Sequence, residues 1–371
     1  MTAQPPPVVL LFPGQGAQQP GMAAGLYGAH AGFRRAMDRV LGCWEEHGHF
    51  LRDHWLAGRP GADTDALQYA QPLLFSVGWA LGRTVMDAGV RPAALLGHSV
   101  GEVVAATLAG VFTLPDAVAV MAGRITSLAG APAGGMLAVA ASVEEVAPYT
   151  DADVVVGAVN GPRQLLLAGP EKGLRAAEER LRADGFTCRR ARALTPFHSP
   201  VLREAALTAL PQLAGLPLRT PTLPLYSAYT GALLTDREAR DPRFWALQPA
   251  EPVLFGPALD ALLGGRDLLL AEAGPGQGLT TLARRHPGVV RGGSVVVPLL
   301  PARAGTGSAE ADGLHAALVR LGPGAAVPGP GSGSGSATMP AARSRASRPG
   351  LQSGSPDSGS GTGAPVLTDG K

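Results

Sequence analysis

The sequence is short of several residue types, and each shortage limits the classes of protein it can encode. Its two cysteines, Cys43 and Cys188, allow one disulfide at most and are read more simply as reduced thiols. No apolar run reaches the length of a membrane span, and no basic-then-apolar leader precedes the first hydrophobic segment. We therefore expect a cytoplasmic protein without membrane contact.

Charge of one sign is also lacking. The 31 Lys and Arg residues nearly balance 29 Asp and Glu residues, for a net charge of +2. Nucleic-acid-binding domains usually carry a dense basic face, so nucleic acid is not an expected partner. Aromatic residues are scarce at 5%, yet 46% of the 371 residues are hydrophobic, enough to bury a sizeable core.

The hydrophobic pattern indicates an α/β fold. Val8–Phe12 is a continuous apolar run that ends at Pro13-Gly14, as in a buried strand of a parallel sheet. Residues 65–88 are typical of a long, mostly buried helix. A short apolar strand at 93–96 then leads through a glycine turn into another helix, and strand followed by helix is the α/β order.

Residues 131–194 have a different pattern. Strand, helix, strand, strand, helix and strand follow one another, which is the order of a ferredoxin-like unit. We therefore predict a large α/β-hydrolase-like domain made of residues 8–130 and 195–321, with a small ferredoxin-like subdomain inserted at 131–194. Residues 322–371 are rich in Gly, Ser and Pro with little to bury, and we predict a disordered tail.

The main chemical signal is Gly97-His98-Ser99-Val100-Gly101, a G-x-S-x-G sequence between a strand and a helix. In that setting Ser99 would sit on a sharp turn as a nucleophile. The helix start places backbone N–H groups near its oxygen, so Val100 N–H is a candidate oxyanion donor. A structural turn bracketed by glycines is the alternative reading.

A serine nucleophile needs a base, because its hydroxyl is weakly nucleophilic at neutral pH. Most of the eight histidines lie in polar segments or at helix ends. We expect His98 to pack beside the serine, where it joins the residues that bind substrate. His198, in Leu-Thr-Pro-Phe-His-Ser-Pro, follows the inserted unit and is the candidate base, although a histidine after Pro-Phe is often structural.

Six short motifs occur in a characteristic order: GQGAQ (14–18), AQPLLF (70–75), GHSVGE (97–102), MAGR (121–124), FHSP (197–200) and GPGQGLT (274–280). Over residues 8–320 the chain resembles the malonyl-CoA:acyl carrier protein transacylases and the acyltransferase domains of modular polyketide synthases. The resemblance implies transfer of a malonyl-type group from coenzyme A to an acyl carrier protein, in polyketide or fatty acid biosynthesis. It implies no cofactor and no metal.

The resemblance also assigns residue roles. Ser99 matches the nucleophile that carries the acyl group, and His198 matches the base, without a triad carboxylate. A backbone carbonyl that we place at Gln248 would orient the histidine. Gln15 would add its backbone N–H to that of Val100 in the oxyanion hole.

Arg124 matches the guanidinium that grips the free carboxylate of the malonyl group, although its spacing also fits a surface arginine on a helix. Phe197 before the histidine and Val100 after the serine favour plain malonyl. Thr195-Pro196 departs from the family pattern, so a larger substituted malonyl unit is the alternative.

Carrier proteins are generally acidic, and the sequence offers two basic groups to meet one. Both groups lie beside motifs of the site, and their members are Arg189, Arg190, Arg192, Arg284 and Arg285. We expect a monomeric, free-standing enzyme that acts on separate carrier proteins, and a domain excised from a larger synthase is the alternative.

Two other functions compete with the transferase. A serine hydrolase of acyl-thioesters would share the serine and histidine, but it would need an acidic triad member between them, and none stands out. A non-catalytic relic of the fold would have no reason to keep Ser99, His198, Arg124 and Gln15 together.

Overall fold

The computed structural model describes residues 6–58 and 62–322. The predicted tail at 322–371 lies outside the described residues, except for Gly322. Within the described part no helix is both long and apolar enough to cross a membrane.

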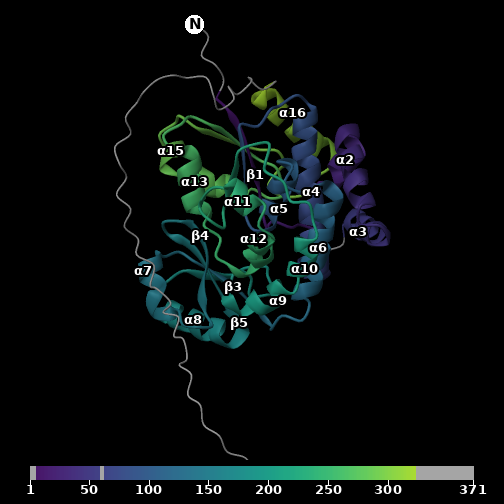
Figure 1. The fold of residues 1–371 in the computed structure, drawn as a ribbon. Coiled ribbons are helices and arrows are strands. Elements are labelled where there is room, and N and C mark those ends of the chain that lie inside the picture. The colour runs from purple at the N-terminus through teal and green to yellow at the C-terminus, as the bar shows by residue number, and fades with distance from the viewer. Residues whose placement is uncertain (1–5, 59–61, 323–371) are drawn as a thin grey trace, which may run out of the picture. The chain divides into compact units, whose positions relative to one another are not determined.

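A mixed α/β architecture is present, and its larger sheet has six strands in the order β10-β9-β1-β2-β7-β8 (Figure 1). All neighbours pair in parallel except β7 and β8, which are antiparallel. The predicted strand Val8–Phe12 is β1, with every residue buried, and the strand predicted at 93–96 is β2. The bounds are β1 Val8–Phe12, β2 Ala94–Gly97, β7 Leu225–Ser227, β8 Ala232–Leu233, β9 Leu269–Glu272 and β10 Val295–Pro298.

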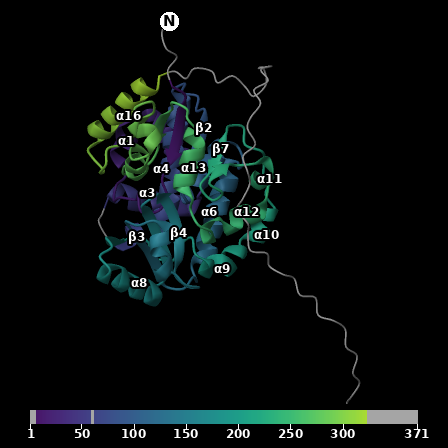
Figure 2. The ribbon, with the colours of Figure 1, turned by 90° about the vertical axis from the view of Figure 1, so that its left-hand side faces the viewer.

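Helices cover both faces of this sheet (Figures 1 and 2). Alternate side chains of the apolar strand β1 point to opposite faces, so both faces are apolar and each is buried by helices. Leu10 and Phe12 join a core with helices from α1 to α6, whereas Val9 and Leu11 join a second core with α13 and α14. The helix predicted at 65–88 is α4. The bounds are α1 Ala24–Ala29, α2 Ala31–Gly42, α3 Glu46–Ala57, α4 Leu67–Asp87, α5 Val100–Leu108, α6 Leu114–Leu128, α13 Phe255–Leu263, α14 Gly278–Arg284, α15 Pro287–Val290 and α16 Gly307–Leu321.

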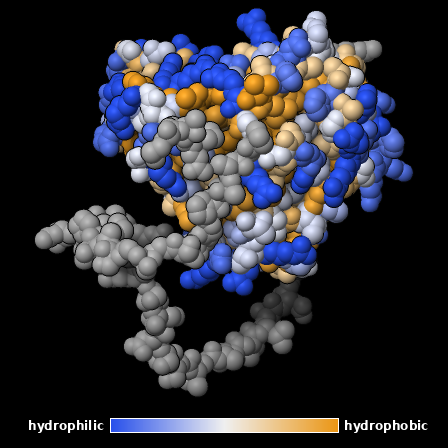
Figure 3. All heavy atoms as spheres, turned by 90° about the horizontal axis from the view of Figure 1, so that it is seen from above, coloured by the Kyte–Doolittle hydropathy of each residue, from blue (hydrophilic) through white to orange (hydrophobic). Residues whose placement is uncertain are grey.

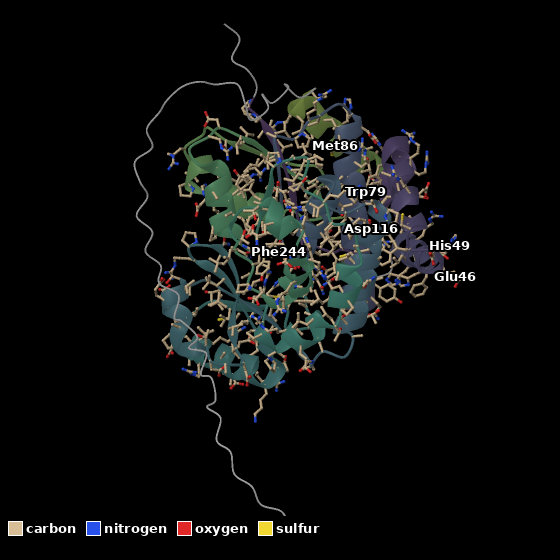
Figure 4. The ribbon with its side chains drawn as sticks, in the orientation of Figure 1. Glu46, His49, Trp79, Met86, Asp116 and Phe244 are labelled. Atoms are coloured by element: carbon tan, nitrogen blue, oxygen red, sulfur yellow. The ribbon has the colours of Figure 1, made fainter. Side chains whose placement is uncertain are left out.

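Side chains fill the space between these layers (Figure 4). Phe244, on the short helix α12 (Pro242–Leu247), lies near the middle of that view and packs edge-on against Trp245, with 5.0 Å between ring centroids. Glu46 and His49, on α3, lie at its outer edge. Figure 3 shows hydrophobic residues at the surface among hydrophilic ones, on the side of the molecule that lies uppermost in Figure 1.

The smaller sheet has four antiparallel strands in the order β4-β5-β3-β6. Its elements follow the predicted chain order, and α8 buries Leu174, Ala177 and Leu181 in a core of its own. The last strand is shorter than the predicted segment, because pairing stops at Arg190. The bounds are β3 Gly134–Val139, α7 Val143–Val146, β4 Val155–Gly161, β5 Gln164–Pro170, α8 Glu171–Ala183 and β6 Cys188–Arg190.

The two sheets meet beside a run of short elements between residues 200 and 251. Val253 exchanges backbone hydrogen bonds with β4, accepting from Val159 at 2.7 Å and donating to Gly157 at 2.9 Å. The short elements are η3 Pro200–Leu202, α9 Arg203–Leu207, α10 Leu210–Ala214, α11 Asp236–Ala239, α12 Pro242–Leu247 and η4 Gln248–Ala250. The small sheet is thus attached to the chain just after the η4 turn.

Candidate active site

Ser99 lies between β2 and α5 on a sharply turned backbone, with φ 55° and ψ −118°. Non-glycine residues rarely adopt a positive φ, and the surrounding packing has to hold it. The flanking glycines permit that packing. A Cβ at Gly101 would lie 2.1 Å from the Phe12 carbonyl oxygen, and one at Gly97 would lie 2.2 Å from Gly101. The predicted strand-turn-helix setting of the serine is therefore observed.

His198 faces Ser99 across 99 positions of sequence. The Ser99 Oγ and His198 Nε2 atoms lie 2.7 Å apart, and His198 Nδ1 lies 2.8 Å from the Glu251 carbonyl oxygen. Because a carbonyl only accepts, Nδ1 carries the proton and Nε2 is free to accept from the serine hydroxyl. The backbone of His198 is also strained, at φ 62°, and its N–H donates to the Pro249 carbonyl at 2.8 Å.

The Gln248 carbonyl predicted to orient the histidine has only a minor effect on the pKa of His198, and the acceptor of the Nδ1 hydrogen bond is the Glu251 carbonyl, three residues further on. Gln248 begins the η4 turn, and the chain leaves that turn extended at Glu251, which frees the Glu251 carbonyl for Nδ1. Gln248 still belongs to the site through its buried side chain. Its Nε2 donates to the Ser99 carbonyl at 2.9 Å and to Glu102 Oε2 at 3.2 Å. The turn 248–251 therefore contacts both members of the pair.

Burial sets the protonation state of the base. It lowers the pKa of His198 to about 3, and the Glu251 carbonyl only partly offsets this. Within the described residues no carboxylate forms an ion pair with His198, in agreement with a pair that lacks a triad acid. The imidazole is therefore neutral, and competent as a base, across the physiological pH range.

The lowered pKa of His198 predicts that protonation of this residue does not reduce the rate of Ser99 acylation between pH 8 and pH 5. A group with a depressed pKa keeps its neutral form as the pH falls, so the rate of Ser99 acylation should not halve near pH 6.5. Single-turnover acylation measured from pH 5 to 8 checks this. The pKa of Glu102 is raised to about 7 by burial, so it titrates in the same range. The Glu102→Gln variant removes that contribution, and a half-maximal rate near pH 6.5 in this variant would contradict the neutral base.

The GQG loop lies directly against the serine turn. A Cβ at Gly14 would lie 2.5 Å from the His98 carbonyl oxygen and 3.0 Å from Ser99 Cβ. The Gln15 side chain bonds elsewhere, donating to the Asp65 carbonyl at 3.3 Å and accepting from Gln71 at 3.2 Å.

Val100 is the first residue of α5, where a backbone N–H has no partner within the helix. Neither its N–H nor that of Gln15 donates to a residue in the described ranges. Both therefore remain predicted oxyanion donors.

Arg124 is buried, with 5% of its surface exposed, so the surface-arginine reading does not hold. It lies on α6 beside a cavity whose lining includes Leu128, Ala206, Trp245 and Pro249. Its Nη2 has no hydrogen-bond partner among the described residues. Glu102 is the carboxylate that acts on it, yet the two form no ion pair within 4.0 Å, and burial lowers the pKa of Arg124 to about 10. A buried, incompletely paired guanidinium is costly unless an anion meets it.

Phe197 is buried in a cluster that includes Leu128 and Ala206, two of the residues that line the Arg124 cavity. His98 has the packing role expected from the sequence. Its Nε2 lies 2.8 Å from Asn160 Oδ1 on β4, and its ring lies against Phe255. His98 therefore ties the serine turn to the small sheet, and a contact with substrate stays a prediction.

The basic residues differ in availability. Arg190 is occupied, because it forms ion pairs with Glu171 at 3.1 Å and Glu178 at 2.7 Å. The other four predicted docking residues are at least partly exposed and form no ion pair within the described residues: Arg189, Arg192, Arg284 and Arg285.

Sequence reasoning did not find three of the polar contacts at this site. Glu251 acts through its backbone, which carries no side-chain signal. Asn160 lies in the inserted unit, 62 positions from His98. Glu102 was quoted only as the end of GHSVGE, although an acidic residue in an otherwise apolar helix is itself a signal of a buried polar contact.

A family model for the acyl transferase domain matches residues 9–284. The chain belongs to the acyl transferase domain family. It is 38% identical over 281 residues to a phenolphthiocerol/phthiocerol polyketide synthase subunit of Mycobacterium tuberculosis (strain ATCC 25618 / H37Rv), a match over 76% of this chain and 19% of that protein. The chain thus spans about a fifth of the length of that relative.

Solved acyltransferase domains share the fold. The acyltransferase domain of SpnD, in complex with 2-(pent-4-yn-1-yl)malonyl, is 34% identical with a TM-score of 0.79, and the match covers 86% of this chain and 77% of that one. The acyltransferase domain from the second module of the salinomycin polyketide synthase is 31% identical with a TM-score of 0.77, over 85% and 73% of the two chains.

Proposed function

We propose that this acyl transferase domain moves a malonyl-type group from coenzyme A, through an acyl-Ser99 intermediate, to the phosphopantetheine thiol of an acyl carrier protein. The observation that carries the proposal is a 2.7 Å Ser99–His198 contact together with a buried guanidinium whose Nη2 lacks a partner. The Ser99–His198 contact supplies an activated nucleophile, and the buried guanidinium of Arg124 favours an acyl group that carries a carboxylate.

In the first half-reaction His198 Nε2 accepts the Ser99 proton while Oγ attacks the thioester carbonyl carbon. The resulting oxyanion would lie against the N–H groups of Val100 and Gln15. When the tetrahedral intermediate collapses, the carbon–sulfur bond breaks and His198 returns its proton to the coenzyme A thiolate. Arg124 would hold the free carboxylate of the acyl group throughout, as a fork on two oxygens.

The second half-reaction runs in reverse with a new thiol. His198 accepts a proton from the phosphopantetheine thiol, and its sulfur attacks the acyl-Ser99 ester carbonyl. Ester cleavage then returns the proton to Ser99 Oγ. The Glu251 carbonyl keeps Nδ1 protonated in both halves, so Nε2 is always the atom that exchanges the proton.

The size of the α-substituent is part of the proposal. Phe197 and Val100 favour plain malonyl, whereas the SpnD domain was solved with a malonyl group that carries a pentynyl chain. We further propose that the larger part of the fold is α/β-hydrolase-like and the inserted sheet ferredoxin-like. The order β4-β5-β3-β6 of the small sheet supports the second description.

A competition experiment tests the function. Malonyl-, methylmalonyl-, ethylmalonyl- and acetyl-CoA are offered together, and the adduct on Ser99 is weighed by intact mass spectrometry with and without a carrier protein. A malonyl-type adduct that disappears only when carrier protein is added supports the transferase. Rapid release of the free acid without carrier protein would instead identify a hydrolase, and no adduct with any donor would leave a non-catalytic domain.

The exposed arginines give a prediction about the partner. Arg189→Glu should lower kcat/KM for the carrier protein about tenfold at low salt, and added salt should shrink the difference, because an acidic partner would meet repulsion. Acylation by malonyl-CoA should not change. Arg35→Glu, an exposed arginine on α2, is the charge-matched control. Equal effects of the two substitutions would remove Arg189 from the docking surface.

A further inference from the structure

Gln18, the last residue of the GQGAQ motif, makes three hydrogen bonds in three different parts of the chain. Its Oε1 accepts from Gly16 N–H at 2.6 Å, and its Nε2 donates to Asp65 Oδ1 at 2.8 Å and to the Arg192 carbonyl at 3.3 Å. Only 1% of its surface is exposed. Its one acceptor and both its N–H groups are therefore engaged, which fixes the orientation of the amide.

Each of these bonds restrains a segment that borders the active site. The Gly16 peptide belongs to the turn whose Gly14 lies against Ser99, and this turn is closed by a 3.3 Å bond from Ala17 N–H to the Gly14 carbonyl. Asp65 precedes α4, and Arg192 lies six positions before His198 on the loop that carries the base. The amide of Gln18 is thus shared by the predicted oxyanion turn and the histidine loop.

We propose that Gln18 is a positioning residue that holds the Gly14–Ala17 turn, and with it the Gln15 N–H, in place against Ser99 and the His198 loop. This inference rests on the proposed function of the site. Gln18 itself does not touch the reacting atoms. Its contribution acts through the direction of one backbone N–H, so its loss should slow the attack on the carbonyl rather than weaken substrate binding.

A side-chain exchange tests the proposal. In Gln18→Glu the new carboxylate can still accept from Gly16 N–H, but it can no longer donate to Asp65 and it repels that carboxylate. In Gln18→Glu with Asp65→Asn the amide and carboxylate have changed places, so the contact between positions 18 and 65 is restored in the opposite sense. Gln19→Glu is the matched control, because Gln19 bonds to Ala302 and Ala304 instead.

Two rates are measured for each variant, together with the melting temperature. One is acylation of Ser99 by malonyl-CoA, and the other is reaction of Ser99 with a fluorophosphonate, which needs the same nucleophile and oxyanion contacts but no acyl pocket. Gln18→Glu should lower both rates about 10- to 100-fold, which is no more than the loss expected from deleting one oxyanion donor. The KM for malonyl-CoA should stay nearly unchanged. The double variant should recover part of the loss, because it restores the contact with position 65 but not the bond to the Arg192 carbonyl. Gln19→Glu should match the wild type.

Several results would overturn the proposal. These are a wild-type fluorophosphonate rate in Gln18→Glu, an equal loss in Gln19→Glu, or a double variant no faster than the single one. If Gln18→Glu does not fold, Gln18→Met decides, because an uncharged side chain without an amide should show the same slow phosphonylation, and a wild-type rate in it ends the idea. If the wild type reacts with fluorophosphonate but never with malonyl-CoA, the proposed function fails while the comparison of variants still decides the role of Gln18.

Discussion

Replacing Ser99 with alanine is expected to abolish the acyl-enzyme altogether. Ser99 Oγ is the atom that faces His198 Nε2 at 2.7 Å, and alanine removes only that atom while it keeps the Cβ and the strained φ of 55°. Loss of a nucleophile in a serine enzyme lowers kcat by a factor of about 10⁶. Intact mass spectrometry after incubation with malonyl-CoA should therefore show unmodified protein.

The control for Ser99→Ala is a measurement that the variant is still folded. Circular dichroism and the melting temperature should stay close to the wild type, because alanine adds no contact and the turn is held by Gly97, Gly101 and Gly14. Ser142→Ala, which removes a hydroxyl that caps α7 in the small subdomain, should still form the adduct. A malonyl adduct that survives in Ser99→Ala would place the nucleophile elsewhere.

Replacing Arg124 with alanine is expected to produce the second large effect. The guanidinium is buried with an unpartnered Nη2, and deleting one member of a desolvated charged pair costs about 2–4 kcal/mol, or a loss of about 30- to 1000-fold in kcat/KM for malonyl-CoA. Acetyl-CoA has no carboxylate, so its kcat/KM should fall much less or rise. The measurement is the ratio of the two constants.

Arg124→Lys sharpens this result. Lysine keeps the positive charge but cannot form a two-pronged contact with a carboxylate, so its malonyl-to-acetyl ratio should fall between those of the wild type and the alanine variant. An unchanged ratio in Arg124→Ala would mean that the arginine is a structural partner of Glu102 and that the carboxylate binds at another place.

Much of the fold could be predicted from the sequence, because its signals are local. Five consecutive apolar residues, bounded by prolines on both sides, indicated β1, and the helical and strand patterns between 131 and 194 indicated the chain order of the small subdomain. The extent of the last strand could not be predicted. Residues after Arg190 still look β-like, but they leave the sheet to reach His198, and that is a tertiary effect.

The site divides in the same way. Ser99 and its glycines form a local motif, and the structure brings His198 to Ser99 and buries Arg124. That Arg124 binds the carboxylate stays a prediction. The carbonyl that orients the base was placed at Gln248 rather than Glu251, because every residue has a carbonyl and only the path of the backbone selects one. The bonds of Gln18 join positions up to 174 apart, a distance over which no local pattern extends.

The backbone at Ser99 and His198 has a consequence for protein engineering. Among the described residues, Ser99 and His198 are two of four non-glycine positions with a positive φ. Glycine tolerates this region where other residues lose about 1–2 kcal/mol, so each substitution to glycine would relieve strain while it removed a reacting group. A library sorted for heat resistance alone would therefore be drawn toward inactive sequences at the two positions that catalysis can least spare.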